Sequence, residues 1–375
     1  MRFDKKFWAT AFTLSGTIIG AGILGMPYVF SKSGFALGVF WLVFLGLATL
    51  YVSLCLGEIT LRTKKVHQIP GYAEFYLGKW GKKIMLFAMF FGIYSALLAY
   101  LIGEGESFSK LFFGSFKYSI LFAIGFWFVM TLFLREGIDG LKKIEFRGVL
   151  LTISIILFTF LFFFQEIKTE NLVSVDYSNI FVPFGVVLFA LLGFSSIPEM
   201  RIEIMGKERK LKKAIIVGTI IPVALYLIFT MTFLGVFGKT VSEVATISSD
   251  SFIPVLGIFT MMAAYFVLSF SLLNVFDYDL NTRKNSFLFV SLVPILMYLI
   301  TATFNLVSFV DILGIAGVVT GGLTIMIILL INIRAKVLGN RKPEFSIPMN
   351  WFIFAIFAAV FAMGVVFEIL NIYLR

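Results

Sequence analysis

The chain has 375 residues, of which 60% are hydrophobic and only 14% charged, and its mean hydropathy is +1.00. A chain this apolar is not a water-soluble globular protein, so the composition predicts an integral membrane protein. One cysteine and one histidine exclude a disulfide framework and a Cys/His metal centre, and they argue against most hydrolase and oxidoreductase chemistry. The net charge of +10 does not indicate nucleic-acid binding, because basic loops of membrane proteins face the anionic cytoplasmic leaflet.

Long apolar runs predict eleven transmembrane helices, because a helix that rises 1.5 Å per residue must cross ~30 Å of hydrocarbon. The first run follows MRFDKKFW directly and is too long for a signal peptide, so we expect it to be the first span. The fold is therefore expected to be all-α, with one membrane domain over 1–375 and no soluble domain. The expected spans are 7–31, 35–61, 83–108, 117–134, 143–165, 180–202, 212–238, 252–277, 286–304, 308–334 and 351–374.

Lysine and arginine are unevenly distributed between alternate loops. With the N-terminus inside the cell, 25 of the 31 basic residues fall in cytoplasmic segments and 6 fall on the opposite side. Cytoplasmic loops of membrane proteins carry this excess. The pattern predicts a multi-pass protein of the cell (plasma or inner) membrane with a cytoplasmic N-terminus, and eleven spans then place the C-terminus outside.

The loop HQIPGYAEFYLGKWGKK, 67–83, places aromatic residues at helical spacing, with lysines just beyond them. Tyr72, Phe75, Tyr76 and Trp80 would share one side of a helix. This pattern predicts a short amphipathic helix in the cytoplasmic interface. We interpret it as an anchor or a gate support rather than a binding site.

Two spans contain residues that interrupt helices. Span one carries Gly20-Ala21-Gly22, followed by Gly25 and Pro27, within SGTIIGAGILGMPY. Span six carries Gly193, Ser195, Ser196 and Pro198 within FALLGFSSIPEM, 173 residues later. Glycine and proline are the residues that most weaken a helix. For span one alone, close helix packing through the GxxxG pattern from Gly16 to Gly20 is an equally good interpretation.

The two interruptions occupy matching places in two blocks of five spans, 1–165 and 180–334, and 351–374 remains as an eleventh helix. Because five is an odd number, the second block must be inverted relative to the first. Paired Gly/Pro-interrupted segments in two halves indicate the midplane binding site of a transporter. Non-helical backbone at that depth must line a cavity or be buried, so the pair favours unwinding over packing, and we expect Gly20, Ala21 and Gly22 to leave the helix.

Three motifs resemble a known family. GTIIGAGILGMPY and FALLGFSSIPE are similar to the signature pair of the amino acid/auxin permease and hydroxy/aromatic amino acid permease branch of the amino acid, polyamine and organocation superfamily. LSFSLLNVFDYDL, 268–280, is similar to the span-eight region of bacterial aromatic permeases. The resemblance implies the LeuT-type five-plus-five inverted repeat with an extra helix. It also implies amino acid transport with a proton or sodium ion, as spans 1, 2, 6 and 7 rock against the rest.

An unwound helix can hold both charges of an amino acid. The free N–H groups of Ala21, Gly22 and Ile23 lie at the positive end of the outer half-helix and suit a carboxylate. The carbonyl groups of Ile18 in span one and Leu192 in span six, expected to end the preceding half-helices, suit the ammonium group, and glycine permits close backbone approach. Tyr94 is the weaker pocket candidate, with an ordinary packed aromatic as its alternative. The expected substrate-binding residues are Ile18, Gly20, Ala21, Gly22, Ile23, Tyr94, Leu192, Gly193, Phe194 and Ser195.

The resemblance places the cation site of sodium-coupled relatives at the carbonyls of Gly16 and Ile19 and the hydroxyl of Ser269. Two departures leave the ion open. Leu268 stands where many relatives have threonine, and Gly16 replaces the asparagine of sodium-coupled neutral amino acid transporters. Ser269 has a second interpretation, a hydrogen bond to the carbonyl one turn earlier. We expect no cofactor beyond a coupling Na⁺ or H⁺.

Acidic residues at membrane depth are costly and usually functional. Glu104 and Glu199 are the candidates for gating or proton handling, and solvation near a helix end is the alternative for both. The other acidic residues weighed are Glu58, Glu106, Asp277, Asp311 and Glu368.

These features together predict a cation-coupled symporter of aromatic or neutral amino acids, with the substrate and the lipid bilayer as partners and no nucleic acid. A sensor of the same fold that binds without transporting is the main alternative, and a channel and a membrane enzyme follow. The sequence leaves the oligomeric state open.

Overall fold

The computed structural model describes residues 5–136, 141–250, 252–276 and 286–373, and the regular structure in these ranges is entirely helical. The short turns are the 3-10 helices η1 (Phe164–Glu166), η2 (Tyr177–Asn179), η3 (Phe194–Ser196), η4 (Glu208–Lys210), η5 (Gly238–Thr240) and η6 (Ala245–Ser248), and the π-helical turn η8 (Gly317–Gly321). The α-helices are α1 (Lys5–Ile18), α2 (Gly22–Ser33), α3 (Phe35–Arg62), α4 (Ile69–Phe113), α5 (Ser119–Glu136), α6 (Leu141–Phe163), α7 (Glu170–Val173), α8 (Val182–Ala190), α9 (Ile197–Glu203), α10 (Leu211–Phe237), α11 (Ile253–Asn274), α12 (Ser286–Phe304), α13 (Phe309–Ala316), α14 (Gly322–Leu338) and α15 (Trp351–Tyr373).

The apolar helices match the expected spans. Within the described ranges, eight segments are long and apolar enough to cross a membrane, and α1 with α2 makes a ninth, bent by 57° at its break. Two shorter apolar helices, 119–135 and 150–166, lie where the fourth and fifth spans are expected. The all-α, polytopic fold predicted from the hydropathy pattern is confirmed.

The third span begins earlier than expected. The amphipathic helix predicted for 67–83 is continuous with it, and α4 keeps a kink at Gly78, where φ is 79° and ψ is −168°. Only glycine adopts this backbone conformation at little cost, so Gly78 can join the two segments at an angle. The aromatic residues divide between core and surface: Tyr72 and Tyr76 are buried, whereas Phe75 and Trp80 are exposed.

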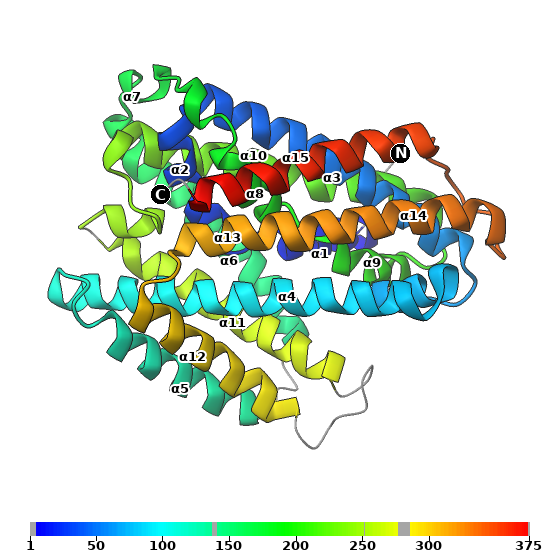
Figure 1. The fold of residues 1–375 in the computed structure, drawn as a ribbon, viewed down its shortest axis with the longest axis horizontal. Helices are drawn as coiled ribbons and strands as arrows, with labels where there is room; N and C mark the ends of the chain where they lie inside the picture. The colour runs from blue at the N-terminus through cyan, green and yellow to red at the C-terminus, as the bar shows by residue number, and fades with distance from the viewer. Residues whose placement is uncertain (1–4, 137–140, 251, 277–285, 374–375) are drawn as a thin grey trace.

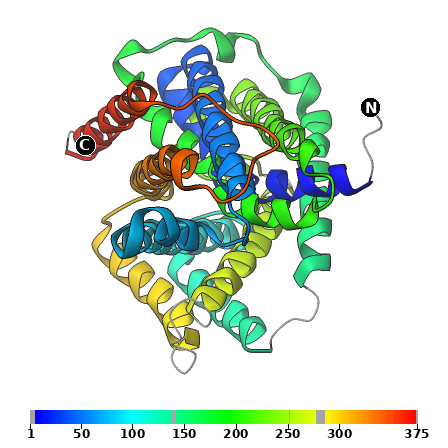
Figure 2. The same ribbon diagram turned by 90° about the vertical axis from the view of Figure 1, so that its right-hand side faces the viewer.

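Helix α4 is central to the arrangement. In Figure 1, α4 and the pair α13 and α14 run side by side along the long axis, with α5, α11 and α12 lying across the lower part. On the other side of the bundle, α10 packs against α1, α2 and α3, and α2 packs against α8. Figure 2 views the bundle from the end at which α4 begins. Apart from Ser195, the residues of the two breaks are buried or half-buried in this bundle, as non-helical backbone at membrane depth requires.

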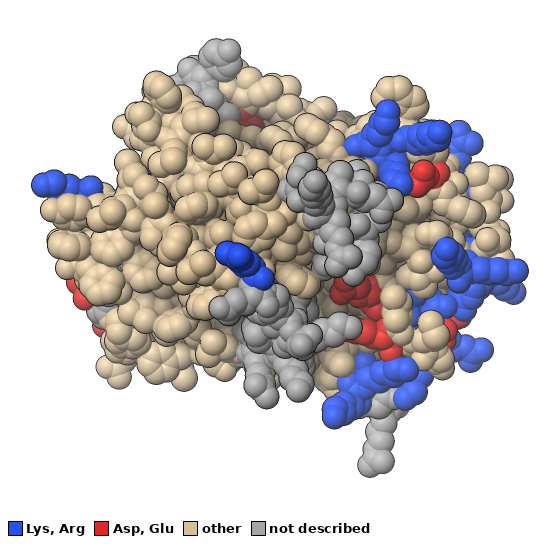
Figure 3. Space-filling model, turned by 90° about the horizontal axis from the view of Figure 1, so that it is seen from below, with Lys and Arg blue, Asp and Glu red and all other residues tan. Residues whose placement is uncertain are grey.

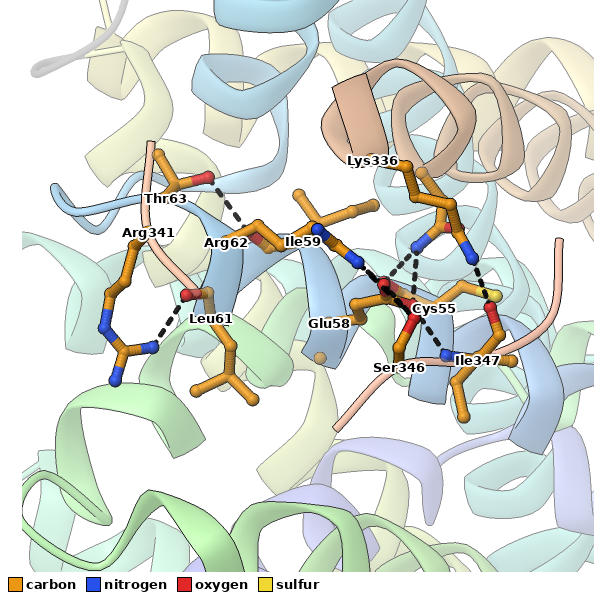
Figure 4. A network of polar contacts seen from close by, with 12 residues as sticks. Cys55, Glu58, Ile59, Leu61, Arg62, Thr63, Lys336, Arg341, Ser346 and Ile347 are labelled. Atoms are coloured by element: carbon orange, nitrogen blue, oxygen red, sulfur yellow. Dashed lines mark hydrogen bonds and ion pairs between the residues drawn. The ribbon is translucent and has the colours of Figure 1, made fainter. Parts of the chain in front are cut away.

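The connection between α14 and α15, residues 339–350, is held against the end of α3, and we call it the strap. Glu58 of α3 is completely buried. Its carboxylate accepts hydrogen bonds from Nε of Arg62 and Oγ of Ser346, both at 2.7 Å, and from the backbone N–H of Ile347 at 2.8 Å (Figure 4). The guanidinium of Arg341 also donates to the carbonyl of Leu61 at 2.7 Å. One buried carboxylate thus joins α3 to the strap.

Charged side chains gather at one end of the molecule. Figure 3 shows most of the visible lysine and arginine at the right-hand end, where α4 begins and α14 ends in Figure 1, and uncharged residues over most of the remainder. This separation agrees with the uneven loop charges in the sequence.

Candidate functional site

The first span is broken where the glycine-rich motif predicts. Helix α1 ends at Ile18 and α2 begins at Gly22, so Ile19, Gly20 and Ala21 lie outside both helices. The prediction that Gly22 also leaves the helix is wrong. A Cβ atom built on Gly22 overlaps Ala190 of α8, so glycine there allows α2 to pack closely on α8 from its first residue.

The sixth span is broken at the matching place. Helix α8 ends at Ala190, the turn η3 covers Phe194–Ser196, and α9 begins at Ile197. A Cβ atom on Gly193 would overlap the side chain of Ile18. The two breaks, far apart in sequence, therefore touch each other directly.

A tyrosine of α10 connects the two broken helices. The hydroxyl oxygen of Tyr226 lies 2.6 Å from the carbonyl oxygen of Ile18 and 2.9 Å from that of Ala190. These are the last helical residues of α1 and α8, whose carbonyl groups have lost their intrahelical partners. The side chain is fully buried. Its single proton can serve either carbonyl, so Tyr226 links both half-helices. Ile18 ends its half-helix as predicted, whereas the prediction that Leu192 ends the other is wrong, because α8 ends two residues earlier at Ala190.

A second tyrosine, on α4, lies at the other side of the first break. The backbone N–H of Ala21 donates to the hydroxyl oxygen of Tyr100 at 3.1 Å, and Tyr100 is buried. A Cβ atom on Gly20 would lie 3.4 Å from the same hydroxyl, an ordinary contact distance. A phenol that accepts from Ala21 keeps its own proton for donation. Tyr100 therefore stands beside the N–H group predicted to hold the substrate carboxylate.

Sequence reasoning missed both tyrosines and proposed Tyr94 instead. The hydroxyl of Tyr94 donates to the carbonyl of Phe289 in α12 at 3.2 Å, so the structure places it against a neighbouring helix rather than at the breaks. A tyrosine within a long apolar run needs a partner for its hydroxyl. Tyr100 and Tyr226 both lie in long apolar runs, so the sequence indicates that each hydroxyl needs a hydrogen-bond partner, but it does not show which group that partner is.

The remaining candidates near the breaks differ in exposure. Phe194 and Ile23 are buried, Leu192 is half-buried and Ser195 is exposed. The prediction that the N–H of Ile23 is free is wrong, because it donates to the carbonyl of Gly20 at 3.4 Å. Ile23 lines a cavity of about 10 Å³ with Phe229 and Thr246, among other residues. This volume is about that of one water molecule, so an amino acid enters this region only when helices move.

The residues of the expected cation site lie on α1, at the first break and on α11. Gly16 is half-buried in α1 and Ile19 is the first residue of the break. Ser269 of α11 is 1% exposed, and its hydroxyl finds no hydrogen-bond partner among the described residues. Its alternative interpretation, a hydrogen bond to the preceding turn, is therefore wrong. Buried hydroxyls without partners are uncommon, and such a group is available to a ligand.

The two acidic candidates lie in opposite environments. Glu104 of α4 is completely buried, which excludes solvation at a helix end, whereas Glu199 of α9 is exposed. Neither oxygen of Glu104 has a hydrogen-bond partner among the described residues. Asp277, also weighed from the sequence, lies outside the described residues.

A membrane bundle with two paired helices broken at mid-span, and with half-helix ends turned toward one another, is the architecture of a secondary transporter. The crystal structure of MhsT in complex with L-phenylalanine is similar in fold, with a TM-score of 0.65, 16% identity and coverage of 98% of both chains. This match confirms the LeuT-type fold. The model of the tryptophan/tyrosine permease family matches residues 3–251, and the chain belongs to this family.

Characterised relatives extend the comparison. The chain is 29% identical over 245 residues to tyrosine-specific transport system 2 of Haemophilus influenzae, covering 63% of this chain and 60% of the relative. It is 25% identical over 252 residues to glutamine transporter 2 of Aliivibrio fischeri, covering 66% and 64%. It is 26% identical over 256 residues to amino acid transporter AVT1H of Arabidopsis thaliana, covering 65% and 59%.

The aligned part thus spans about three-fifths of the length of these relatives. The family and its relatives are amino acid permeases and not enzymes, and the resemblance found in the sequence motifs is confirmed.

Proposed function

We propose that the protein is a secondary active amino acid transporter that works by alternating access. The observation that carries this proposal is the meeting of the two breaks. The backbone N–H of Ala21, just before α2, is hydrogen-bonded to the hydroxyl of Tyr100, and the carbonyl groups at the ends of α1 and α8 are hydrogen-bonded to the hydroxyl of Tyr226.

The chemistry of these groups fits an amino acid zwitterion. The substrate carboxylate would accept from Ala21 and Tyr100, and the ammonium group would donate to the carbonyls of Ile18 and Ala190, each of which has a second lone pair. Hydrogen bonds to charged groups are stronger than those the tyrosine hydroxyls make now. The substrate can therefore compete with the tyrosines for the same backbone groups.

We infer aromatic or neutral amino acids as the substrate class. The groups that meet at the breaks are backbone amides, carbonyls and phenols, so they balance the two charges of a zwitterion and no third charge. The named substrates of relatives, tyrosine and glutamine, support both parts of this class.

Coupling to H⁺ or Na⁺ would make the transport concentrative. One cation that enters with a neutral zwitterion adds about 2.3 kcal/mol per 100 mV of membrane potential. The basic end in Figure 3 supports a cytoplasmic N-terminus, because α4 begins and α14 ends there. In the proposed cycle α1, α2, α3, α8, α9 and α10 move together against α4 and its neighbours.

Reconstitution into proteoliposomes tests this function. We expect saturable uptake and counterflow of labelled tyrosine, tryptophan, phenylalanine or glutamine. Purified protein should also melt at a higher temperature with its substrate, because a ligand that binds the folded state stabilises it. Stabilisation without counterflow would identify a sensor instead, and ion current without saturation would identify a channel.

A further inference from the structure

Glu104 has a setting unlike that of an ordinary structural carboxylate. Its side chain is 0% exposed, and both oxygens lack a hydrogen-bond partner among the described residues. Glu58 is equally buried, yet it accepts from Arg62, Ser346 and Ile347. Buried polar side chains normally have partners, and an exception calls for a functional explanation.

Glu104 is flanked in the sequence by two glycines, and each lies close to a neighbouring helix. A Cβ atom on Gly103 would lie 2.8 Å from Sδ of Met261 on α11, and one on Gly105 would lie 2.5 Å from the carbonyl oxygen of Ser119 on α5. Glycine on each side of Glu104 therefore lets α5 and α11 close on this part of α4. The Glu104 side chain is fully buried in this packing.

Glu104 is also close to the site. It follows Tyr100 by four residues, so both side chains lie on the same side of α4, with roughly 5–6 Å between their Cβ atoms. Tyr100 accepts the N–H of Ala21 in the first break. A movement of the break that changes the contact at Tyr100 would therefore reach Glu104 one turn away.

None of the titratable side chains described on the helices that pack against α4 pairs with Glu104. On α4 itself, Glu106 is half-buried two residues later, and Lys110 pairs with Asp250 at 3.3 Å. The neighbouring titratable residues are Arg135 on α5, Tyr265 on α11, Tyr298 on α12, Asp311 on α13, and Arg334 and Lys336 on α14. An isolated ionised carboxylate is strongly disfavoured away from water, so the neutral acid fits the enclosed state.

We propose that the Glu104 carboxyl group carries the coupling proton of the transport cycle. This proposal rests on the proposed transport function. In the outward-open state the carboxylate takes a proton from a hydronium ion of the external water: the O–H bond of the acid forms, one O–H bond of hydronium breaks, and a water molecule is left. The helices close over the neutral acid and the substrate. When the site opens inward, the O–H bond breaks and the proton leaves to cytoplasmic water, so one proton enters with each amino acid.

The test compares exchange with gradient-driven accumulation in sodium-free proteoliposomes. Counterflow needs no net proton movement, whereas an inward gradient of about one pH unit drives about tenfold accumulation if one proton accompanies each substrate. The probe is whichever of tyrosine, tryptophan, phenylalanine or glutamine gives the largest wild-type counterflow. We expect Glu104→Gln to keep counterflow and to lose the pH-driven accumulation.

Matched variants separate the carboxyl group from its neighbours. Glu106→Gln, two residues away, should keep both activities, and Glu104→Asp should keep pH-driven accumulation because it retains a carboxyl group. His67, the one histidine of the chain, lies in the connection between α3 and α4, and burial and the nearby Lys65 lower its pKa. Should Glu104→Gln fail to fold, a pH dye trapped with wild-type protein still tests the coupling proton: substrate added without sodium should acidify the interior, and an unchanged interior pH overturns the proposal.

The possible results distinguish a failure of the proton site from a failure of the transport function. Full pH-driven accumulation by Glu104→Gln, or wild-type accumulation driven by sodium alone without interior acidification, overturns the proton site and leaves the transport function standing. Wild-type protein without any counterflow overturns the transport function and this proposal with it.

Discussion

Glu58 and Glu104 lie on consecutive helices, α3 and α4, and both side chains are completely buried. The first is held by a guanidinium, a hydroxyl and a backbone N–H group, and the second has no partner among the described residues. The carboxylate of Glu58 joins α3 to the strap, and these hydrogen bonds hold it in place. The carboxyl group of Glu104 has no such bonds to break, so it can take up or release a proton when its surroundings change. The difference teaches that burial alone does not identify a functional carboxylate; the hydrogen-bond partners do.

The largest expected effect is a loss of stability when Glu58, the carboxylate with hydrogen-bond partners, is replaced. Glu58→Ala should destabilise the protein by about 3–5 kcal/mol, because Arg62 and the N–H of Ile347 lose their acceptor in a buried setting. Thermal melting in detergent would measure it. Glu104→Gln is the matched variant and should leave the melting temperature almost unchanged, since it removes no hydrogen bond. Equal losses in the two variants would contradict the comparison.

A second prediction concerns the two glycines of the first break. Gly22→Ala should cost about 1–3 kcal/mol, because the added methyl group overlaps Ala190 and forces α2 away from α8. Gly20→Ala should be tolerated, since its Cβ atom meets the Tyr100 hydroxyl at 3.4 Å. Any loss of transport in Gly20→Ala then reports on the site, whereas Gly22 substitutions report mainly on packing. Unchanged melting of Gly22→Ala would show that α2 and α8 are not locked together.

The sequence predicts the breaks well because glycine and proline act locally. Both interruptions lie where their motifs predict, and the inverted relation of the two halves follows from counting spans. Gly22 was misassigned because its glycine serves contact with α8, which the sequence around it does not show. Tyr226 was missed for the same reason: its partner Ile18 is 208 residues away. Contacts between distant segments are what the sequence pattern leaves out.

A third prediction tests the tyrosine that links the breaks. Tyr226→Phe should destabilise the protein by about 1–2 kcal/mol, because the carbonyls of Ile18 and Ala190 share its one hydroxyl. Tyr100→Phe should cost less stability and raise the KM for the substrate about tenfold, the equivalent of ~1.4 kcal/mol of lost binding. Melting curves and initial uptake rates on both variants distinguish these roles. An unchanged KM in Tyr100→Phe would remove this hydroxyl from the carboxylate site.

The smallest expected effect extends the comparison to two buried serines. The hydroxyl oxygen of Ser15 lies 3.2 Å from the carbonyl oxygen of Ala11 and 3.0 Å from that of Gly218, and its one proton can donate to either, whereas the hydroxyl of Ser269 has no described partner. Ser15→Ala should therefore cost about 1 kcal/mol and Ser269→Ala at most ~0.5 kcal/mol. If Glu104 carries the proton, Ser269→Ala should also leave pH-driven accumulation intact. A Ser269→Ala variant that loses sodium-driven accumulation but keeps counterflow would instead place the coupling ion at Ser269. In that case Ser269, and not Glu104, would be the unpaired group that serves transport.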